Sequence, residues 1–144
     1  MSTSNEEIEI RASIERWEAA MRTGKVDEIV KHYADNLVAY DAVMKLQFVG
    51  KKAYTDHWHA CMEFAPHGMI YEAHDLVIHT EGSIAFSYNL ARCGGYDDQG
   101  NEQFSWMRVT RGYRKMNGQW LVIHEHFSSP FDMESGKVLF DATP

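Results

Sequence analysis

Residues 102–131 read EQFSWMRVTRGYRKMNGQWLVIHEHFSSPF and hold two strand-like runs on either side of Asn117-Gly118. In both runs aromatic and β-branched residues recur at every second position, and Asn-Gly strongly favours a two-residue hairpin turn. The stretch therefore predicts a long antiparallel hairpin. Both of its faces carry large apolar side chains as well as Arg, Glu or His, so neither face is expected to meet water alone. One face should line the core or a cavity, and the other should meet another element or a second subunit.

The composition fits an ordinary globular domain. The 144 residues are 44% hydrophobic and 24% charged, which is enough to build one core, so we expect a single domain over residues 1–144. A net charge of −7 argues against nucleic acid or an anionic membrane as partner. The chain has no signal peptide pattern and no run of about eighteen apolar residues, so we expect a cytoplasmic protein. Cys61 and Cys93 are expected to be free thiols.

The rest of the chain supplies helices first and most of its strands later. Apolar residues at helical spacing, with Gly or Asn as stop signals, predict helices over 5–23, 26–33 and 51–63. Extended segments are predicted over 37–41, 45–49, 69–79 and 83–94, ahead of the hairpin. This order indicates the α+β class, with a curved antiparallel sheet and three helices on one face.

Six short strings in this order are similar to a known family: GKVDEIVKHYAD (24–35), VAYD (38–41), FVG (48–50), WMRVT (106–110), GQW (118–120) and HEHFSSP (124–130). The chain resembles the SnoaL-like and ketosteroid isomerase homologue branch of the nuclear-transport-factor-2-like (NTF2-like) superfamily. The resemblance implies a cone of curved sheet closed by three helices, an apolar pocket inside the cone and a homodimer through the outer sheet face. It is specific for fold and weak for activity, because the superfamily holds isomerases, dehydratases and non-catalytic domains. The last string also resembles the association domain of calmodulin-dependent kinase, which is an assembly module.

The resemblance assigns roles to four positions. Asp41 falls where the steroid isomerases hold the carboxylate that shuttles a proton, and Tyr33 matches a tyrosine there. Trp17 replaces their oxyanion-stabilising tyrosine, and their second acid falls at or near Thr110, which argues against steroid isomerisation itself. Burial among aromatic rings would raise the pKa of Asp41 and suit it to acid–base work. The alternative is that Asp41 caps the turn that follows it.

Two arginines compete for the inner face of the hairpin. A simple two-residue turn places Arg108 beside Glu125 and Phe127, where it would bind an anionic ligand or pair with Glu125. The likeness to the kinase association domain implies Arg111 instead. A single bulge would exchange the two arginines.

The histidines offer acid–base groups, whereas we expect no metal and no cofactor. His124 and His126 share one strand face, with Glu125 on the other, and His124 is expected either in the pocket or as a structural residue at a dimer face. A metal would need a third ligand beside this pair. His57 and His59 point about 200° apart on a helix and cannot share an ion.

Two functions fit these observations. The first is binding of a small, partly apolar carbonyl or carboxylate compound in an aromatic pocket, with isomerisation or elimination by Asp41 or His124 as base. The substrate-binding residues expected are Trp17, Tyr33, Tyr54, Trp58, Met62, Tyr88, Trp106, Arg108 and Phe127. The second is a non-catalytic ligand-binding or assembly domain, which a narrow interior with Arg108 paired to Glu125 would favour. Outward-facing Trp120 and Val122 would predict a homodimer.

Overall fold

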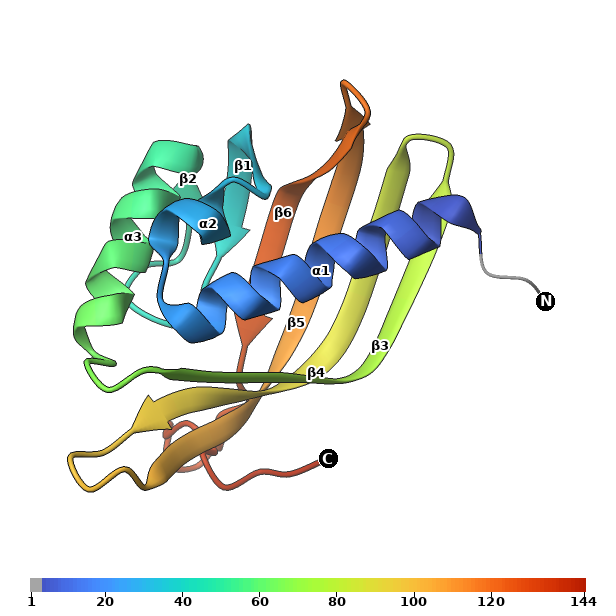
Figure 1. Cartoon of the computed structure of the whole chain (residues 1–144). Coiled ribbons are helices and arrows are strands. Elements are labelled where there is room, and N and C mark those ends of the chain that lie inside the picture. The colour runs from blue at the N-terminus through green and yellow to red at the C-terminus, as the bar shows by residue number, and fades with distance from the viewer. Residues whose placement is uncertain (1–3) are drawn as a thin grey trace.

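A single curved sheet with three helices on its concave face makes up the computed structural model, which describes residues 4–144 (Figure 1). This confirms the α+β class and the cone. The elements follow in the order α1 (Asn5–Thr23), α2 (Val26–Val30), β1 (Tyr33–Tyr40), β2 (Phe48–Val49), α3 (Lys51–Glu63), β3 (Met69–Glu81), β4 (Ile84–Tyr96), β5 (Glu102–Met116) and β6 (Gln119–Ser128).

The long helix α1 has a signal at each end. The Ser4 hydroxyl accepts a hydrogen bond from the Glu7 backbone N–H at 3.2 Å, and Gly24 ends the helix with a φ of 71°. Glycine adopts this left-handed backbone conformation at little cost in free energy. Among the helices of residues 4–144, none combines the length and the apolar character needed to cross a bilayer.

The second helix is shorter than its apolar spacing predicts. It ends at Val30, and Tyr33 begins β1, because the Val122 N–H donates to the His32 carbonyl at 2.9 Å and Tyr33 pairs with Val122. Sheet pairing has outweighed helical propensity here. Of the extended segment predicted over 45–49, only the two residues of β2 pair.

The six strands lie in the order β2-β1-β6-β5-β4-β3. All neighbours are antiparallel except β1 and β6, which are parallel. The long strands β3, β4 and β5 curl around α1, which crosses the concave face, while α3 covers β1 (Figure 1).

Aromatic side chains fill the space between the helices and the concave face. The largest buried ones include Trp17, Tyr33, Tyr54, Trp58, Tyr71, Tyr113, Trp120 and Phe127. Trp120 and Val122 are 6% and 4% exposed and belong to this core. Because Trp120 and Val122 do not face outward, they do not predict a homodimer.

Candidate functional site

A buried carboxylate stands at the centre of the concave face. Glu125 on β6 is 0% exposed and accepts three hydrogen bonds, from Arg111 Nε at 2.6 Å, from the Tyr33 hydroxyl at 2.8 Å and from the Tyr54 hydroxyl at 2.6 Å. Trp17 Nε1 donates in turn to the Tyr33 hydroxyl at 3.0 Å. Buried charges persist when they are paired and hydrogen-bonded in this way. This network occupies Trp17, Tyr33 and Tyr54 with internal contacts.

Electrostatics within the network keep Arg111 charged and the two tyrosines neutral. Burial alone lowers the pKa of Arg111, but Glu125 and then the nearby tyrosines outweigh it and hold that pKa well above its usual value. Burial, followed by the charge of Glu125, raises the pKa values of Tyr33 and Tyr54 well above 10. At neutral pH Arg111 is therefore charged and both phenols are neutral.

Arg111 has donors left over after this pairing. Its side chain is 2% exposed, and its Nη1 and Nη2 atoms have no hydrogen-bond partner. Its guanidinium lies over the Trp17 ring at 4.2 Å. The side chain also lines a void of about 10 Å³, whose lining comprises Ser13, Ile14, Trp17, His32, Arg111, Tyr113 and Val122. Such a void is about the size of a single water molecule, and unpaired buried donors are costly.

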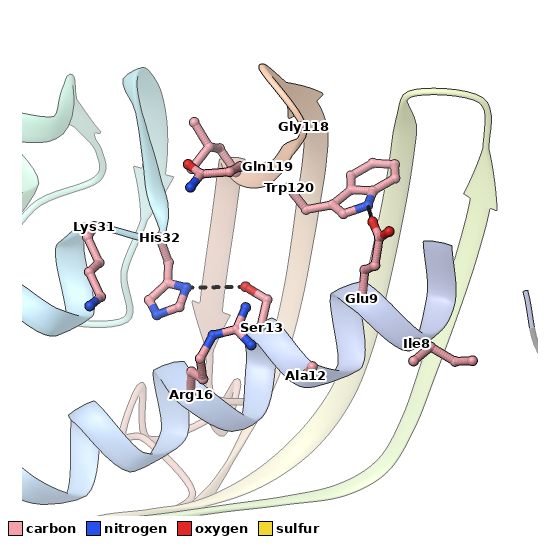
Figure 2. A pocket seen from close by; sticks show the side chains of 11 residues that line it. Ile8, Glu9, Ala12, Ser13, Arg16, Lys31, His32, Gly118, Gln119 and Trp120 are labelled. Atoms are coloured by element: carbon pink, nitrogen blue, oxygen red, sulfur yellow. Dashed lines mark hydrogen bonds between the residues drawn. The ribbon is translucent and has the colours of Figure 1, made fainter. Parts of the chain in front are cut away.

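An open cleft of about 610 Å³ lies next to this void and shares Ser13 and His32 with it (Figure 2). Its walls are the first turns of α1, the residues that follow α2 and the turn between β5 and β6; the lining residues are Ile8, Glu9, Ala12, Ser13, Arg16, Lys31, His32, Gly118, Gln119, Trp120 and Leu121. Figure 2 shows Arg16 on one wall and Lys31 with His32 on the other. The cleft therefore combines two cations with an apolar floor, which Ile8, Ala12 and Leu121 form.

The acidic group of the cleft is already engaged. Glu9 Oε2 accepts from Trp120 Nε1 at 2.9 Å and lies 3.3 Å from Lys115 Nζ. On the opposite wall Lys31 contacts Glu28 on the exposed surface of α2. An exposed ion pair of that kind contributes little to stability, so Lys31 can readily exchange Glu28 for another anion.

His32 links the cleft to the void. Its Nδ1 lies 3.2 Å from the Ser13 hydroxyl, and its Nε2 is buried without a partner. Burial, followed by the charges of Arg16, Lys31 and Arg111, lowers its pKa to about 4. His32 is therefore neutral at pH 7, so one of its ring nitrogens can donate and the other can accept.

At the other end of β1, three side chains meet. Asp41 follows the last residue of β1, and its Oδ1 accepts from the Ala42 N–H at 2.7 Å, which confirms the capping interpretation. Its Oδ2 contacts Nε2 of His57 on α3, and Cys61 Sγ lies 3.5 Å from the same nitrogen. Burial, and then Asp41, raises the pKa of the Cys61 thiol to about 11, so it is no thiolate nucleophile. Within residues 4–144 these three are the group that could hold a metal ion.

Comparison with known proteins identifies the family. Residues 10–132 match the model of the SnoaL-like domain. The chain belongs to the SnoaL-like domain family. No curated protein is significantly similar to this sequence.

Solved structures agree with this SnoaL-like assignment. An NTF2-like protein of unknown function from Pseudomonas putida KT2440 is 47% identical, with a TM-score of 0.92 and 100% of both chains covered. A ketosteroid isomerase-like protein from Erwinia carotovora atroseptica is 20% identical, with a TM-score of 0.73 over 89% of this chain and 100% of that one. A Xanthomonas campestris protein, named as a candidate calcium/calmodulin dependent protein kinase II association domain, is also 20% identical, with a TM-score of 0.75 over 87% of this chain and 88% of its own. The last two likenesses show the fold alone.

The SnoaL-like cone holds five of the predicted binding residues in its core: Trp17, Tyr33, Tyr54, Trp58 and Phe127. Met62 packs partly buried against them. Their contact with a ligand stays a prediction.

Four other predicted site residues lie on the convex side of the sheet, so their placement inside the cone was wrong. Tyr88 is 46% exposed. Arg108 is exposed and donates from Nε to the Ser128 hydroxyl at 3.1 Å. Trp106 packs edge-on against His74 at 4.8 Å. His124 uses Nδ1 to donate to the Val38 carbonyl at 2.6 Å and packs against Tyr40.

A bulge in β6 causes the exchange of the two arginines. Arg111 pairs with Glu125 and Gly112 with His124, but Tyr113 pairs with Val122, so Ile123 is the extra residue. Because one extra residue reverses the side on which later residues point, Glu125 and Val122 both face the core. Arg111 is thereby inside and Arg108 outside.

Several residues of the two clusters had no strong signal in the sequence. His57 and Cys61 share a helix face at a spacing of i, i+4 with the buried Tyr54 close by, and that spacing could have pointed to them. Ser13, Arg16 and His32 come together only through the packing of α1 against the start of β1.

Proposed function

We propose that this SnoaL-like domain binds a small, partly apolar carboxylate in the cleft between α1 and the β5–β6 turn. The observation that carries the proposal is the pair of unpartnered Arg111 nitrogens, buried behind His32 where the void adjoins the cleft. Arginine and neutral histidine are donors suited to a carboxylate, and a buried donor without a partner gains most from one.

The charges around the cleft favour an anion. Arg16 and Lys31 stand at the opening, while Glu9 is held by Trp120 and Lys115. The chain as a whole carries −7, so this is a local basic site on an acidic protein. Such a site raises the local concentration of small anions.

The body of the ligand would lie on the apolar floor. Ile8, Ala12 and Leu121 line the cleft beside the cations. A carboxylate head at Arg16 and Lys31 with a short apolar body along these residues satisfies both parts of the lining. Because the void behind His32 has space for about one water molecule, the head would reach Arg111 through a bridging water.

Binding without catalysis agrees best with the rest of the interior. Trp17 and Tyr33, which would have to stabilise an enolate oxygen, are committed to the Glu125 network. A pair of Arg and Glu in a filled interior is the arrangement expected for the non-catalytic alternative, with Arg111 in place of Arg108. An isomerase or lyase reaction with Asp41 as base stays a prediction from the sequence.

Calorimetric titration with matched ligands tests the proposal. A series of short monocarboxylates should bind, and the primary amides of the same shape should bind at least about tenfold more weakly, because a charge-assisted hydrogen bond contributes about 1.5–3 kcal/mol. Arg16→Gln and Lys31→Gln should each weaken carboxylate binding with little effect on amides. Lys52→Gln on the exposed side of α3 is the control.

The proposal fails if amides and acids bind equally, or if the Arg16 and Lys31 variants bind like the Lys52 control. Because changes at buried Arg111 affect folding as well, His32→Gln supplies a second probe of the inner end of the cleft. We expect that variant to weaken carboxylates more than amides.

A further inference from the structure

The cluster of Asp41, His57 and Cys61 has the atoms of a transition-metal site. Asp41 Oδ2, His57 Nε2 and Cys61 Sγ all lie within 4.8 Å of one another. They come from two elements: Asp41 from the end of β1, and His57 and Cys61 from adjacent turns of α3. Carboxylate, imidazole and thiol are all ligands that zinc accepts.

Hydrogen bonding satisfies this cluster only with one long contact. Asp41 Oδ2 and Cys61 Sγ both approach the same ring nitrogen, Nε2 of His57, and Sγ is closer to Nε2 at 3.5 Å than to Nδ1 at 3.9 Å. If Nε2 carries a proton it donates to Asp41 and has no lone pair for the thiol. If it is bare it accepts from the thiol and has nothing to give the carboxylate. In the first case the thiol is left with the longer contact to Nδ1, at 3.9 Å.

The spacing between Cys61 and His57 agrees with tetrahedral coordination. Zinc holds nitrogen at about 2.0–2.1 Å and sulfur at about 2.3 Å, which places two such ligand atoms roughly 3.5 Å apart. Cys61 Sγ and His57 Nε2 already stand at 3.5 Å. Asp41 begins the loop between β1 and β2, so its side chain can rotate away from its direct contact with His57.

The surroundings hold the central ligand in place. The His57 side chain is 2% exposed, and its ring stacks on Phe48 at 4.0 Å with an interplanar angle of 26°. Asp41 is 16% exposed and Cys61 is half-buried, so the cluster still opens toward solvent. A rigid imidazole with an accessible fourth position is the pattern of sites that keep a water on the metal.

We propose that Asp41, His57 and Cys61 form a binding site for one divalent zinc-like ion. Asp41 Oδ2, His57 Nε2 and Cys61 Sγ supply three ligands, and a water or a ligand oxygen takes the fourth position. The Cys61 thiol gives its proton to solvent as the sulfur–metal bond forms, and the carboxylate and thiolate together balance the two positive charges. The sequence pairs His57 with His59, which points away from it on the helix, whereas the fold brings His57 to Asp41 and Cys61.

This site is independent of the carboxylate cleft. His32 immediately precedes β1 and Asp41 immediately follows it, so the two sites lie at opposite ends of that strand. The residues that line the cleft and the three residues of this cluster have no member in common. Variants of one site therefore leave the other unchanged, and either proposal can fail alone.

Cobalt titration tests the site directly. After treatment with a chelator, the full chain is titrated with Co²⁺ and its absorption is followed, since a thiolate ligand gives cobalt an intense charge-transfer band in the near ultraviolet; Zn²⁺ affinity and stoichiometry come from calorimetry. The wild type should show that band and bind one ion per chain. Cys61→Ser should lose the band, and His57→Gln and Asp41→Asn should weaken Zn²⁺ binding. Circular dichroism checks that each variant is folded.

Two matched controls separate this site from adventitious binding. Cys93→Ser removes the other half-buried thiol, and His59→Gln removes an exposed imidazole on the same helix. Both should keep the band and the affinity. Absence of the band in the wild type overturns the proposal, as does a band that survives Cys61→Ser or disappears with Cys93→Ser.

Discussion

At the scale of single residues, Glu125 is the group on which the interior depends. Its carboxylate is the partner of Arg111, which is 2% exposed. Glu125→Gln keeps the shape but leaves the guanidinium charge without a counter-ion, so we expect the free energy of unfolding to fall by about 3–5 kcal/mol. Urea unfolding at neutral pH measures the change.

The double variant Arg111→Met/Glu125→Gln is the matched control for this prediction. It removes the stranded charge as well, and apolar replacement of a buried pair is often close to neutral. It should be more stable than Glu125→Gln alone. A single variant within about 1 kcal/mol of the wild type would contradict the assigned role of Glu125.

His32 makes stability depend on pH. Its pKa in the folded chain is about 4, against 6.5 for an ordinary histidine, because of burial and then of Arg16, Lys31 and Arg111, with Glu28 opposing them. Between these two values the unfolded chain binds more protons than the folded one. The free energy of unfolding should therefore fall as pH decreases through this window, by about 2–3 kcal/mol, and this contribution is fully present above pH 6.5.

Unfolding of the wild type and of His32→Gln at neutral pH and at about pH 5 separates this effect from other titrations. The variant should lose less stability than the wild type over the same interval. Equal losses in the two proteins would show that His32 is not the group responsible.

At the scale of elements, the bulge at Ile123 decides which side chains enter the cone. Deleting Ile123 joins Val122 to His124 and restores simple alternation, so Trp120, Val122, Glu125 and Phe127 all still face inward. Deleting His126, which is exposed, instead turns Phe127 outward. We expect the Ile123 deletion to keep cooperative thermal unfolding and to have the higher melting temperature of the two. The reverse order would contradict the proposed register.

Elements with a strong periodic pattern could be predicted from the sequence, whereas the faces of the hairpin could not. The Asn117-Gly118 turn, the long helix α1 and α3 follow local signals that the structure confirms. The inward-facing residues of β6 have even numbers before Ile123 and odd numbers after it. This shift explains why both alternating sets of residues in that strand carry apolar and polar groups. No local residue type marks this bulge, so the choice between Arg108 and Arg111 needed the register itself.

The candidate site was less accessible to prediction because its parts are distant in sequence. The cleft joins the first turns of α1 to the β5–β6 turn, more than half the chain away, and only the packing of α1 brings them together (Figure 2). Asp41 was found through the resemblance, but its partner His57 was not. Side chains from α3 reach Asp41 through tertiary contact that no spacing rule describes.

At the scale of the whole molecule, the convex face of the sheet is the surface on which the homodimer remains a prediction. Ile84, Phe86 and Tyr88 are between 44% and 47% exposed there, and His79 stacks on Phe86 at 4.7 Å. A row of exposed apolar side chains is typical of a surface that a second copy covers. Light scattering at micromolar concentration should give twice the chain mass for the wild type and less for Phe86→Lys. A monomeric wild type would refute the dimer.

The most direct test of the central claim is a crystal structure of the protein with a short carboxylate that carries bromine on its apolar end. We expect an anomalous bromine peak on the floor of the cleft beside Ile8 and Leu121, with the carboxylate within hydrogen-bond distance of Arg16, Lys31 or His32. A peak inside the cone beside Asp41, or full occupancy retained in the Arg16→Gln/Lys31→Gln protein, would contradict it.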